Sequence, residues 1–297
     1  MTQALVPLPF HRLAYRQPYG SWEFLVAPPP RDLIGIVDSF WISRGRVTFL
    51  LEKVLPQNNV ELMFNLEQPF GVPNRAPADR SYRRAWIAGM QRDWLIVAPK
   101  YDPLREPSYL LSVRMPPLGA YRVLGIPMRE LAQDVIELSD TLGDDVHAVH
   151  QRLGETAGAG MQLAVLCDFV RRRLALDRVS LHADAQAAIA MLARSAGTER
   201  IENICRSIGV SRKHLRHLFH AHVGLTPKTY ARMLRFRRIV DFIQSRPPRL
   251  DWARLAMSCG YYDQPHFNRE FREFAGMTPE EFAGAGSLDG LTMLIDG

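Results

Sequence analysis

The sequence predicts an α+β protein with an N-terminal β-rich, barrel- or sandwich-like domain followed by helices, and a C-terminal all-α domain. Short apolar runs between Pro and Gly fill residues 1–118, whereas apolar residues at helical spacing fill residues 183–284. Charge divides the chain in the same way. Residues 182–284 hold 16 Lys and Arg against 10 Asp and Glu, a surplus of six, and the remainder balances at 21 of each. The C-terminal third is therefore the part expected to meet a polyanion.

The N-terminal domain is expected over residues 1–118. Many short strands between turn residues are typical of a barrel or sandwich. The expected strands lie at 22–27, 33–43, 47–54, 60–66, 86–89, 94–97 and 109–115. A barrel lined with aromatic side chains holds a small apolar ligand, so a small-molecule effector is a candidate partner, and a plain β core is the alternative. The aromatic candidates are Trp22, Trp41, Trp86, Trp94, Tyr101 and Tyr109.

A helical region is expected over residues 119–180, between the two domains. Residues 128–142, 146–153 and 160–176 each place apolar side chains three and four positions apart, as amphipathic helices do. We expect these helices to form a homodimer interface, with packing between the two domains as the alternative. At the other end of the chain, residues 285–297 are rich in Gly and are expected to be a loose tail.

The C-terminal domain, expected over residues 183–284, contains an internal repeat. Segments that begin at Ser211 and Asp263 correspond to each other when the chain is shifted by 52 residues. A repeated unit of this kind is one structural element used twice. The shift pairs Leu215 with Phe267, Phe219 with Phe271, Gly224 with Gly276, Thr226 with Thr278, and Pro227 with Pro279.

Each unit of the repeat is predicted to be a helix-turn-helix. The first helices cover 201–208 and 251–258, and a turn with Gly follows each. Ser211 and Asp263 then stand where a side-chain oxygen caps a second helix, whose outer face is polar and basic. Residues 227–245 are predicted to form one helix of about 28 Å at 1.5 Å per residue. Two units joined by this helix match successive major grooves, which are about 34 Å apart.

Residues 185–283 resemble the DNA-binding domain of the AraC/XylS family. The resemblance rests on Gly209, Ser211, Gly224 and Pro227 in the first unit, and on Gly260-Tyr261, DQPHFNREF from Asp263 and Gly276-Met277-Thr278-Pro279 in the second. The family usually has Arg where His217 stands and Ala where Cys205 stands. The N-terminal part is similar to a sensor region of some members through residues 55–65, 113–120 and 124–127. The resemblance implies a sequence-specific transcription regulator, here expected to be a dimeric activator.

The resemblance also implies which residues meet double-stranded DNA at a promoter or operator. Arg and Lys suit the guanine edge, and Asn and Gln suit adenine. The expected base contacts are Lys213, Arg216, His217, Gln264, His266, Asn268 and Arg269. The expected phosphate contacts, which position the protein without reading sequence, are Ser211, Arg212, Arg232, Arg235 and Arg272. RNA polymerase is a further candidate partner.

Other classes of protein find little support in the sequence. It has no GxSxG, P-loop or metal-binding motif, so we expect no enzyme activity, cofactor or metal. The acidic residue Glu61 and the pair His147 and His150 are scattered rather than clustered in a motif. A signal peptide and a long apolar run are lacking, which predicts a cytoplasmic, nucleoid-associated protein without membrane contact. A ligand-independent dimeric regulator and a non-specific architectural nucleic-acid-binding protein remain as alternatives.

Overall fold

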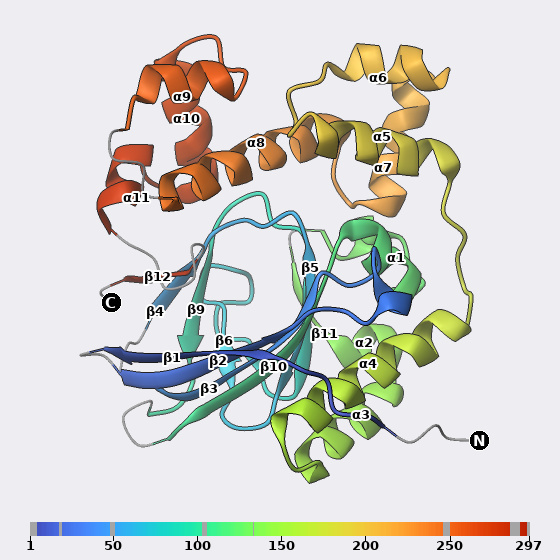
Figure 1. The fold of residues 1–297 in the computed structure, drawn as a ribbon, viewed down its shortest axis with the longest axis vertical. Helices are drawn as coiled ribbons and strands as arrows, with labels where there is room; N and C mark the ends of the chain where they lie inside the picture. The colour runs from blue at the N-terminus through green and yellow to red at the C-terminus, as the bar shows by residue number, and fades with distance from the viewer. Residues whose placement is uncertain are drawn as a thin grey trace.

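Two domains stack along the long axis of the computed structural model, which describes residues 5–17, 20–47, 51–102, 106–132, 134–245, 250–285 and 292–295. Figure 1 shows the β-rich domain with helices along one side, and the all-helical domain above it. The predicted α+β class with a β-rich N-terminal domain and a helical C-terminal domain is confirmed.

Two antiparallel sheets build the N-terminal domain. The larger sheet has the strand order β1-β2-β3-β10-β5-β8-β11 and the smaller has the order β12-β4-β9-β6-β7. The larger contains β1 (His11–Gln17), β2 (Gly20–Ala27), β3 (Ser39–Val47), β5 (Val60–Asn65), β8 (Ala85–Ala88), β10 (Ser108–Met115) and β11 (Val135–Glu137). The smaller contains β4 (Leu51–Val54), β6 (Phe70–Gly71), β7 (Ser81–Tyr82), β9 (Leu95–Pro99) and β12 (Thr292–Ile295). Strands β1, β6, β7, β11 and β12 were not predicted from the sequence.

The larger sheet separates two apolar clusters because side chains alternate along its strands. On β5, Leu62 and Phe64 belong to the cluster beneath the helices, whereas Met63 belongs to the cluster that faces the smaller sheet. The ring of Phe64 meets that of Phe169 edge to face, with 6.0 Å between centroids. The same strands therefore hold helices on one face and leave the other to the space between the sheets.

Helices cover the larger sheet. They are α1 (Pro117–Leu124), α2 (Leu138–Leu142), α3 (Asp145–Glu155) and α4 (Ala159–Ala175), with short 3-10 turns η1 (Arg31–Leu33) and η2 (Met128–Glu130). The predicted helix over 128–142 is wrong, because that stretch contains η2, β11 and α2. Val135, Ile136 and Glu137 pair with β8 and extend the sheet, so long-range strand pairing outweighs the helical spacing.

The C-terminal domain is all-helical, as expected. Its helices are α5 (Ala183–Arg194), α6 (Ile201–Ile208), α7 (Arg212–His222), α8 (Pro227–Gln244), α9 (Trp252–Ser258), α10 (Gln264–Ala275) and α11 (Pro279–Ala285), of which α11 was not predicted. Both predicted caps form: Ser211 Oγ accepts the His214 N–H at 3.1 Å, and Asp263 Oδ1 accepts the His266 N–H at 2.7 Å. The two units and the connecting helix therefore follow the local signals in the sequence.

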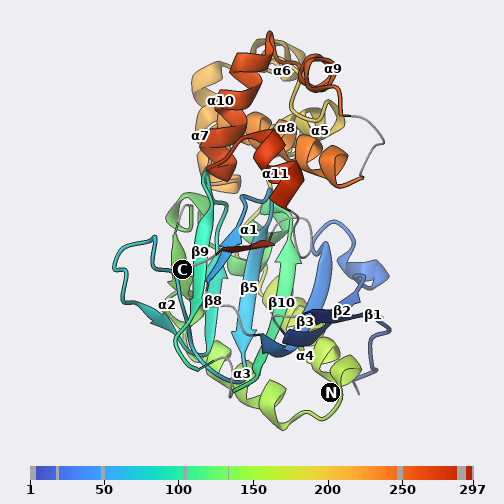
Figure 2. The ribbon, with the colours of Figure 1, turned by 90° about the vertical axis from the view of Figure 1, so that its left-hand side faces the viewer.

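The C-terminal segment departs from the loose tail expected over 285–297. Thr292–Ile295 is strand β12, which pairs antiparallel with β4, and Met293 is 3% exposed. The remainder of that tail after Ala285 lies outside the described residues. The chain thus returns from the helical domain to the edge of the smaller sheet, as Figures 1 and 2 show.

Candidate nucleic-acid interface

Helix α7 presents a polar and basic face to solvent. Leu215, Leu218 and Phe219 are buried, while the predicted base contacts Lys213, Arg216 and His217 are exposed. Of the predicted phosphate contacts, Ser211 and Arg212 are also exposed at the start of the helix. Because buried and exposed positions alternate at the helical period, the same sequence pattern anchors the helix and directs its cations outward.

Helix α10 repeats this arrangement with aromatic anchors. Phe267, Phe271 and Phe274 are buried against α8 and α9, and Phe236 of α8 lies 5.0 Å from Phe271 between ring centroids. The predicted DNA contacts Gln264, His266, Arg269 and Arg272 are exposed, and Asn268 is half-buried. Tyr262, which the sequence analysis did not single out, is 93% exposed just before the helix.

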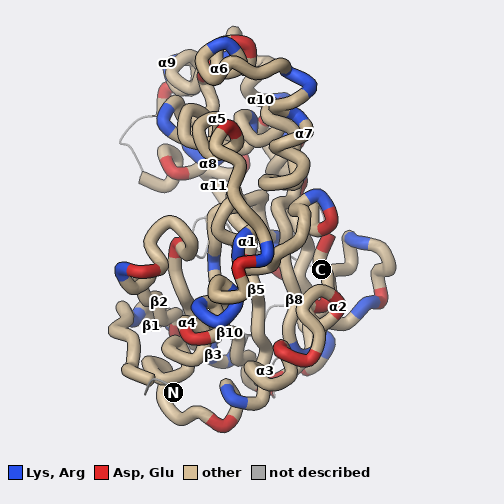
Figure 3. Tube along the Cα trace, turned by 90° about the vertical axis from the view of Figure 1, so that its right-hand side faces the viewer, with Lys and Arg blue, Asp and Glu red and all other residues tan. Residues whose placement is uncertain are grey.

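Helices α7 and α10 lie on the same side of the C-terminal domain. Figures 2 and 3 view the molecule from opposite sides, and both draw the two helices toward one edge, with Lys and Arg along it in Figure 3. The connecting helix α8 has 18 residues, which gives it a length of about 27 Å at 1.5 Å per residue. The domain therefore carries two helices with exposed polar faces on a single side, of which α7 has a cationic surplus, and α8 joins them.

Two predicted phosphate contacts have a different partner in the structure. Arg232 Nε lies 2.7 Å from Glu270 Oε2, and Arg235 Nη2 lies 2.9 Å from Glu270 Oε1. The Arg side chains are 25% and 17% exposed, and that of Glu270 is 5% exposed. Arg232 also pairs with Glu273. These arginines tie α8 to α10, which corrects the expectation that they project toward phosphates.

Glu270 is the centre of this cluster. Burial alone would raise the pKa of its carboxyl, but the hydroxyl of Tyr261, which donates to Oε1 at 2.6 Å, and the two arginines hold the pKa below its ordinary value. The carboxylate is thus charged and accepts bonds from three side chains of α8 and the turn before α10. Such a network fixes α10 on α8.

The end of α7 contacts the N-terminal domain. His222 is buried, and its ring lies 4.5 Å from that of Tyr121 on α1. Its Nδ1 is 2.9 Å from the carbonyl oxygen of Leu218, and its Nε2 accepts the His182 backbone N–H at 3.3 Å. Burial lowers the pKa of His222, in keeping with an uncharged ring that donates from one nitrogen and accepts at the other.

The end of α10 makes a second contact with the N-terminal domain. Gly276 ends the helix with φ +67°, and a Cβ there would lie 2.8 Å from Lys53 Nζ and closer still to Trp94 Nε1. Lys53 Nζ lies 4.5 Å from the centre of the Trp94 ring, and burial lowers its pKa. The end of α10 therefore rests on Lys53 of β4 and on Trp94, just before β9, without room for a side chain at Gly276.

We expect Gly276→Ala to disturb this contact more than a matched change elsewhere. Gly209 has a similar φ of +75° but nothing within 4 Å of its Cβ position. Gly209→Ala should therefore cost only the left-handed strain, about 1–2 kcal/mol. Gly276→Ala should add about 1–3 kcal/mol for overpacking against Trp94. Melting temperatures of the two variants measure the difference, and equal losses would contradict the close approach.

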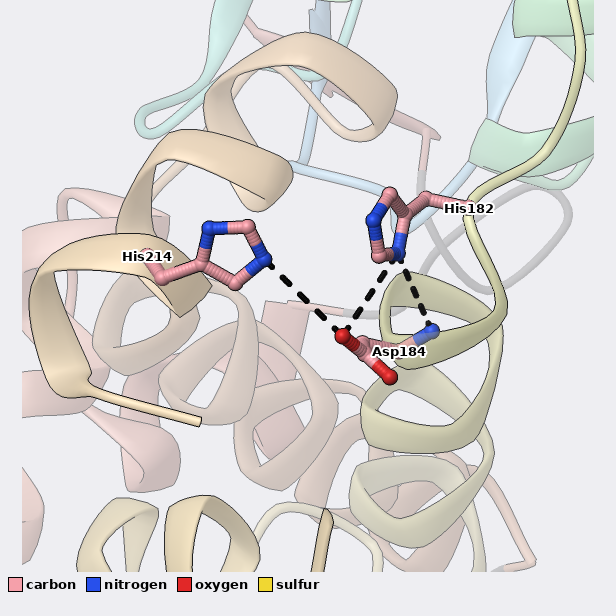
Figure 4. Close-up of side chains that lie close together, drawn as sticks. All are labelled: His182, Asp184 and His214. Carbon is pink, nitrogen blue, oxygen red and sulfur yellow. Dashed lines mark hydrogen bonds and ion pairs between the residues drawn. The ribbon is translucent and has the colours of Figure 1, made fainter. Parts of the chain in front are cut away.

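A cluster of His182, Asp184 and His214 joins the start of α5 to α7 (Figure 4). Asp184 Oδ2 lies 3.7 Å from His182 Nδ1 and 3.8 Å from His214 Nε2. Asp184 and His214 are 30 residues apart in the sequence, so their spacing does not reveal the cluster. His182 Nδ1 already accepts the Asp184 backbone N–H at 3.3 Å, so we interpret the cluster as a helix cap.

The space between the two sheets contains a cavity of about 210 Å³. Of the aromatic residues expected to line such a space, Trp22, Trp41 and Trp86 do so. Trp94 instead contacts Lys53, and the rings of Tyr101 and Phe70 pack edge to face at 5.7 Å. Tyr109 bonds to Gln162 of α4. The sequence analysis did not name four further lining residues, Tyr15, Phe24, Phe70 and Tyr82.

Among the described residues, no helix has the length and apolar character needed to cross a bilayer.

Family models match both domains of the chain. A helix-turn-helix domain matches residues 204–285, and a domain of unknown function (DUF6597) matches residues 25–137. The first match covers α7 and α10 together with the helices that support them.

Similar proteins are bacterial regulators. The HTH-type transcriptional regulator ArgR of Pseudomonas aeruginosa is 28% identical over 96 residues, which is 32% of this chain and 29% of ArgR. The Msm operon regulatory protein of Streptococcus mutans is 26% identical over 83 residues, or 28% and 29% of the two chains. This chain thus spans under a third of the length of either relative.

Solved structures include ToxT from Vibrio cholerae, at 12% identity and a TM-score of 0.45, covering 82% of this chain and 96% of ToxT. A Chromobacterium violaceum regulator with an AraC-type DNA-binding domain shares 25% identity, at a TM-score of 0.30, over 33% of this chain and 87% of its own. The paired helix-turn-helix units, the matching domain over residues 204–285 and the related regulator sequences together support the resemblance of the C-terminal part of this chain to regulators of the AraC/XylS family.

Proposed function

We propose that the protein is a sequence-specific transcription regulator that reads two successive major grooves of double-stranded DNA. The observation that carries this proposal is the pair of capped helices, α7 and α10, whose polar faces are exposed on one side of the domain. A helix-turn-helix places its second helix in the major groove. The length of α8, about 27 Å, suits two grooves about 34 Å apart when the side chains at each end add their reach.

Each of the two recognition helices is proposed to contact both bases and phosphates. Lys213, Arg216 and His217 of α7 face one groove, and Gln264, His266, Asn268 and Arg269 of α10 face the next. Ser211, Arg212 and Arg272 meet phosphates. His217 stands where the family usually has Arg, so we expect the first groove to be read with less preference for guanine than the second.

The N-terminal domain controls DNA binding by the C-terminal domain. The aromatic cavity is the proposed effector site. The contacts of His222 with α1, and of Gly276 with Lys53 of β4 and with Trp94, are the proposed route by which its state reaches α7 and α10. Helices α3 and α4 remain the proposed dimer interface, and RNA polymerase is the proposed partner of an activator. The site of action is the cytoplasm, at the nucleoid.

Selection of bound duplexes from a random pool tests this function. We expect the full chain to enrich a site with two conserved boxes about 10 base pairs apart, and to prefer it over random DNA by about 1000-fold or more. Binding that follows salt concentration but ignores sequence would contradict the proposal and favour an architectural nucleic-acid-binding protein. Binding that is specific but unaffected by any ligand would favour a ligand-independent dimeric regulator.

A further inference from the structure

Aromatic residues make up seven of the 22 residues that line the cavity between the two sheets. They come from both sheets: Tyr15, Trp22, Phe24, Trp41 and Trp86 from the larger, Phe70 and Tyr82 from the smaller. Aromatic rings offer flat, polarisable faces that stack on other rings in offset or edge-to-face arrangements. The lining therefore favours a flat aromatic occupant over a sugar, whose hydroxyl groups would need many hydrogen-bond partners.

The charged residues of the lining disfavour an anion. They are Glu52, Glu61 and Arg114. Arg114 lies opposite Glu61 in the pairing of β10 with β5, and its Nε is 2.5 Å from Glu61 Oε1. The cation in the wall is thus already bonded to a carboxylate, and the formal charge of the three residues is negative. A buried carboxylate ligand would lose its hydration and gain no cation that is not already paired.

The volume of the cavity limits the size of the occupant. An apolar cavity of about 150 Å³ holds one benzene ring, and this one is about 210 Å³. The available space therefore suits a molecule of about two fused rings. The cavity is small for most drug-sized ligands, which occupy about 300 Å³ or more.

The C-terminal strand contributes to the cavity wall. Thr292 lines the cavity together with Glu52 and Val54 of β4, the strand with which β12 pairs. Between these two β4 residues, Lys53 packs on Trp94 beside Gly276 of the DNA-binding domain. Strand alternation thus puts the cavity on one face of β4 and the end of α10 on the other.

We propose that this cavity binds a small, flat aromatic molecule without a negative charge, and that β12 forms one of its walls. The proposal deepens the effector role proposed above and rests on it only for the consequence for DNA binding. Because only six residues separate the end of α11 from the start of β12 in the sequence, an occupant that holds β12 in place also restrains the position of the DNA-binding domain.

Calorimetric titration of the full chain with three naphthalene derivatives tests the ligand class. We expect naphthalene and 2-naphthol to bind at one site per chain, and 2-naphthoate to bind at least tenfold more weakly. Quenching of the lining tryptophans gives a second readout of the same event. Absence of saturable binding by all three compounds, or binding of 2-naphthoate as tight as that of 2-naphthol, would overturn the proposal.

A cavity-filling variant and its control test the place of binding. Ala88 lines the cavity, so Ala88→Phe should weaken 2-naphthol binding at least tenfold. Ala14 is exposed on β1, and Ala14→Phe should leave the affinity within twofold. Equal affinities of the two variants would show that the compound binds elsewhere.

Hydrogen exchange of the unmodified chain tests the role of β12 and needs no variant to fold. Saturating 2-naphthol should slow exchange of the amides of Thr292–Ile295 at least fivefold, and unchanged exchange would refute the role of the strand. A chain that selects a duplex sequence but binds none of the compounds would refute this inference alone. A chain that binds 2-naphthol but prefers no duplex would instead refute the proposed function.

Discussion

Arg269→Ala should weaken binding to the selected duplex by about 5- to 150-fold, corresponding to about 1–3 kcal/mol for one good base contact. Arg269 is exposed on α10, and its backbone is held by the Asp263 cap and by the buried rings of Phe267 and Phe271. Truncation of its side chain should therefore remove one base contact without moving the helix. Competition binding against random DNA at fixed salt concentration measures the effect.

The control for this prediction is an arginine of the same domain that lies away from both recognition helices. Arg194 is exposed at the end of α5. Arg194→Ala removes the same charge and should change affinity for selected and random duplexes alike, by less than about threefold. If Arg269→Ala also weakened both duplexes equally, Arg269 would be a phosphate contact and its base-reading role would be refuted.

Glu270→Gln should lower the free energy of unfolding of the C-terminal domain by about 3 kcal/mol, since removal of one partner of a buried ion pair leaves the other charge uncompensated. The value is placed at the low end of the usual range because Arg232 and Arg235 are still partly exposed. Urea denaturation followed by circular dichroism measures the loss.

Glu273→Gln is the matched control for Glu270→Gln. Glu273 also pairs with Arg232, but its side chain is 63% exposed, so the variant should lose less than about 1 kcal/mol. Equal losses for the two variants would mean that the pairing of Glu270 does not hold α10 on α8.

Stability should also respond to pH through Glu270. The folded state lowers its pKa below the ordinary value of 4.5. The contribution of this carboxylate is therefore fully present above pH 4.5 and is lost as pH falls through the lower, folded pKa. Loss of C-terminal-domain stability in this acid range should be smaller in Glu270→Gln than in the natural sequence. An identical pH dependence of the two proteins would contradict the assignment.

The C-terminal domain could be predicted closely because its signals are local. Ser211 and Asp263 cap helices three residues ahead, and the apolar positions of α7 and α10 follow the helical period. The partners of Arg232 and Arg235 were not predictable in this way. Their carboxylate lies 35 or more residues along the chain, and a helical pattern does not say which distant acid a cation will meet.

The strand pairing of the N-terminal domain could be predicted less well, because it joins segments that are far apart in the sequence. The apolar run that contains Phe40, Trp41 and Ile42 predicts a strand, but the neighbour of that strand in the sheet is the distant β10, which the run does not reveal. The strand β12 was missed for the same reason. The strand with which it pairs, β4, lies more than 230 residues earlier, and its short, Gly-flanked sequence carries little strand signal of its own.

The central claim is that α7 and α10 read neighbouring grooves on one side of a duplex. Base-by-base interference mapping on the selected site tests it most directly. The account predicts two clusters of interfering bases about 10 base pairs apart on one face of the duplex, of which Arg269→Ala removes only one. A single continuous cluster, or loss of both clusters in that variant, would contradict it.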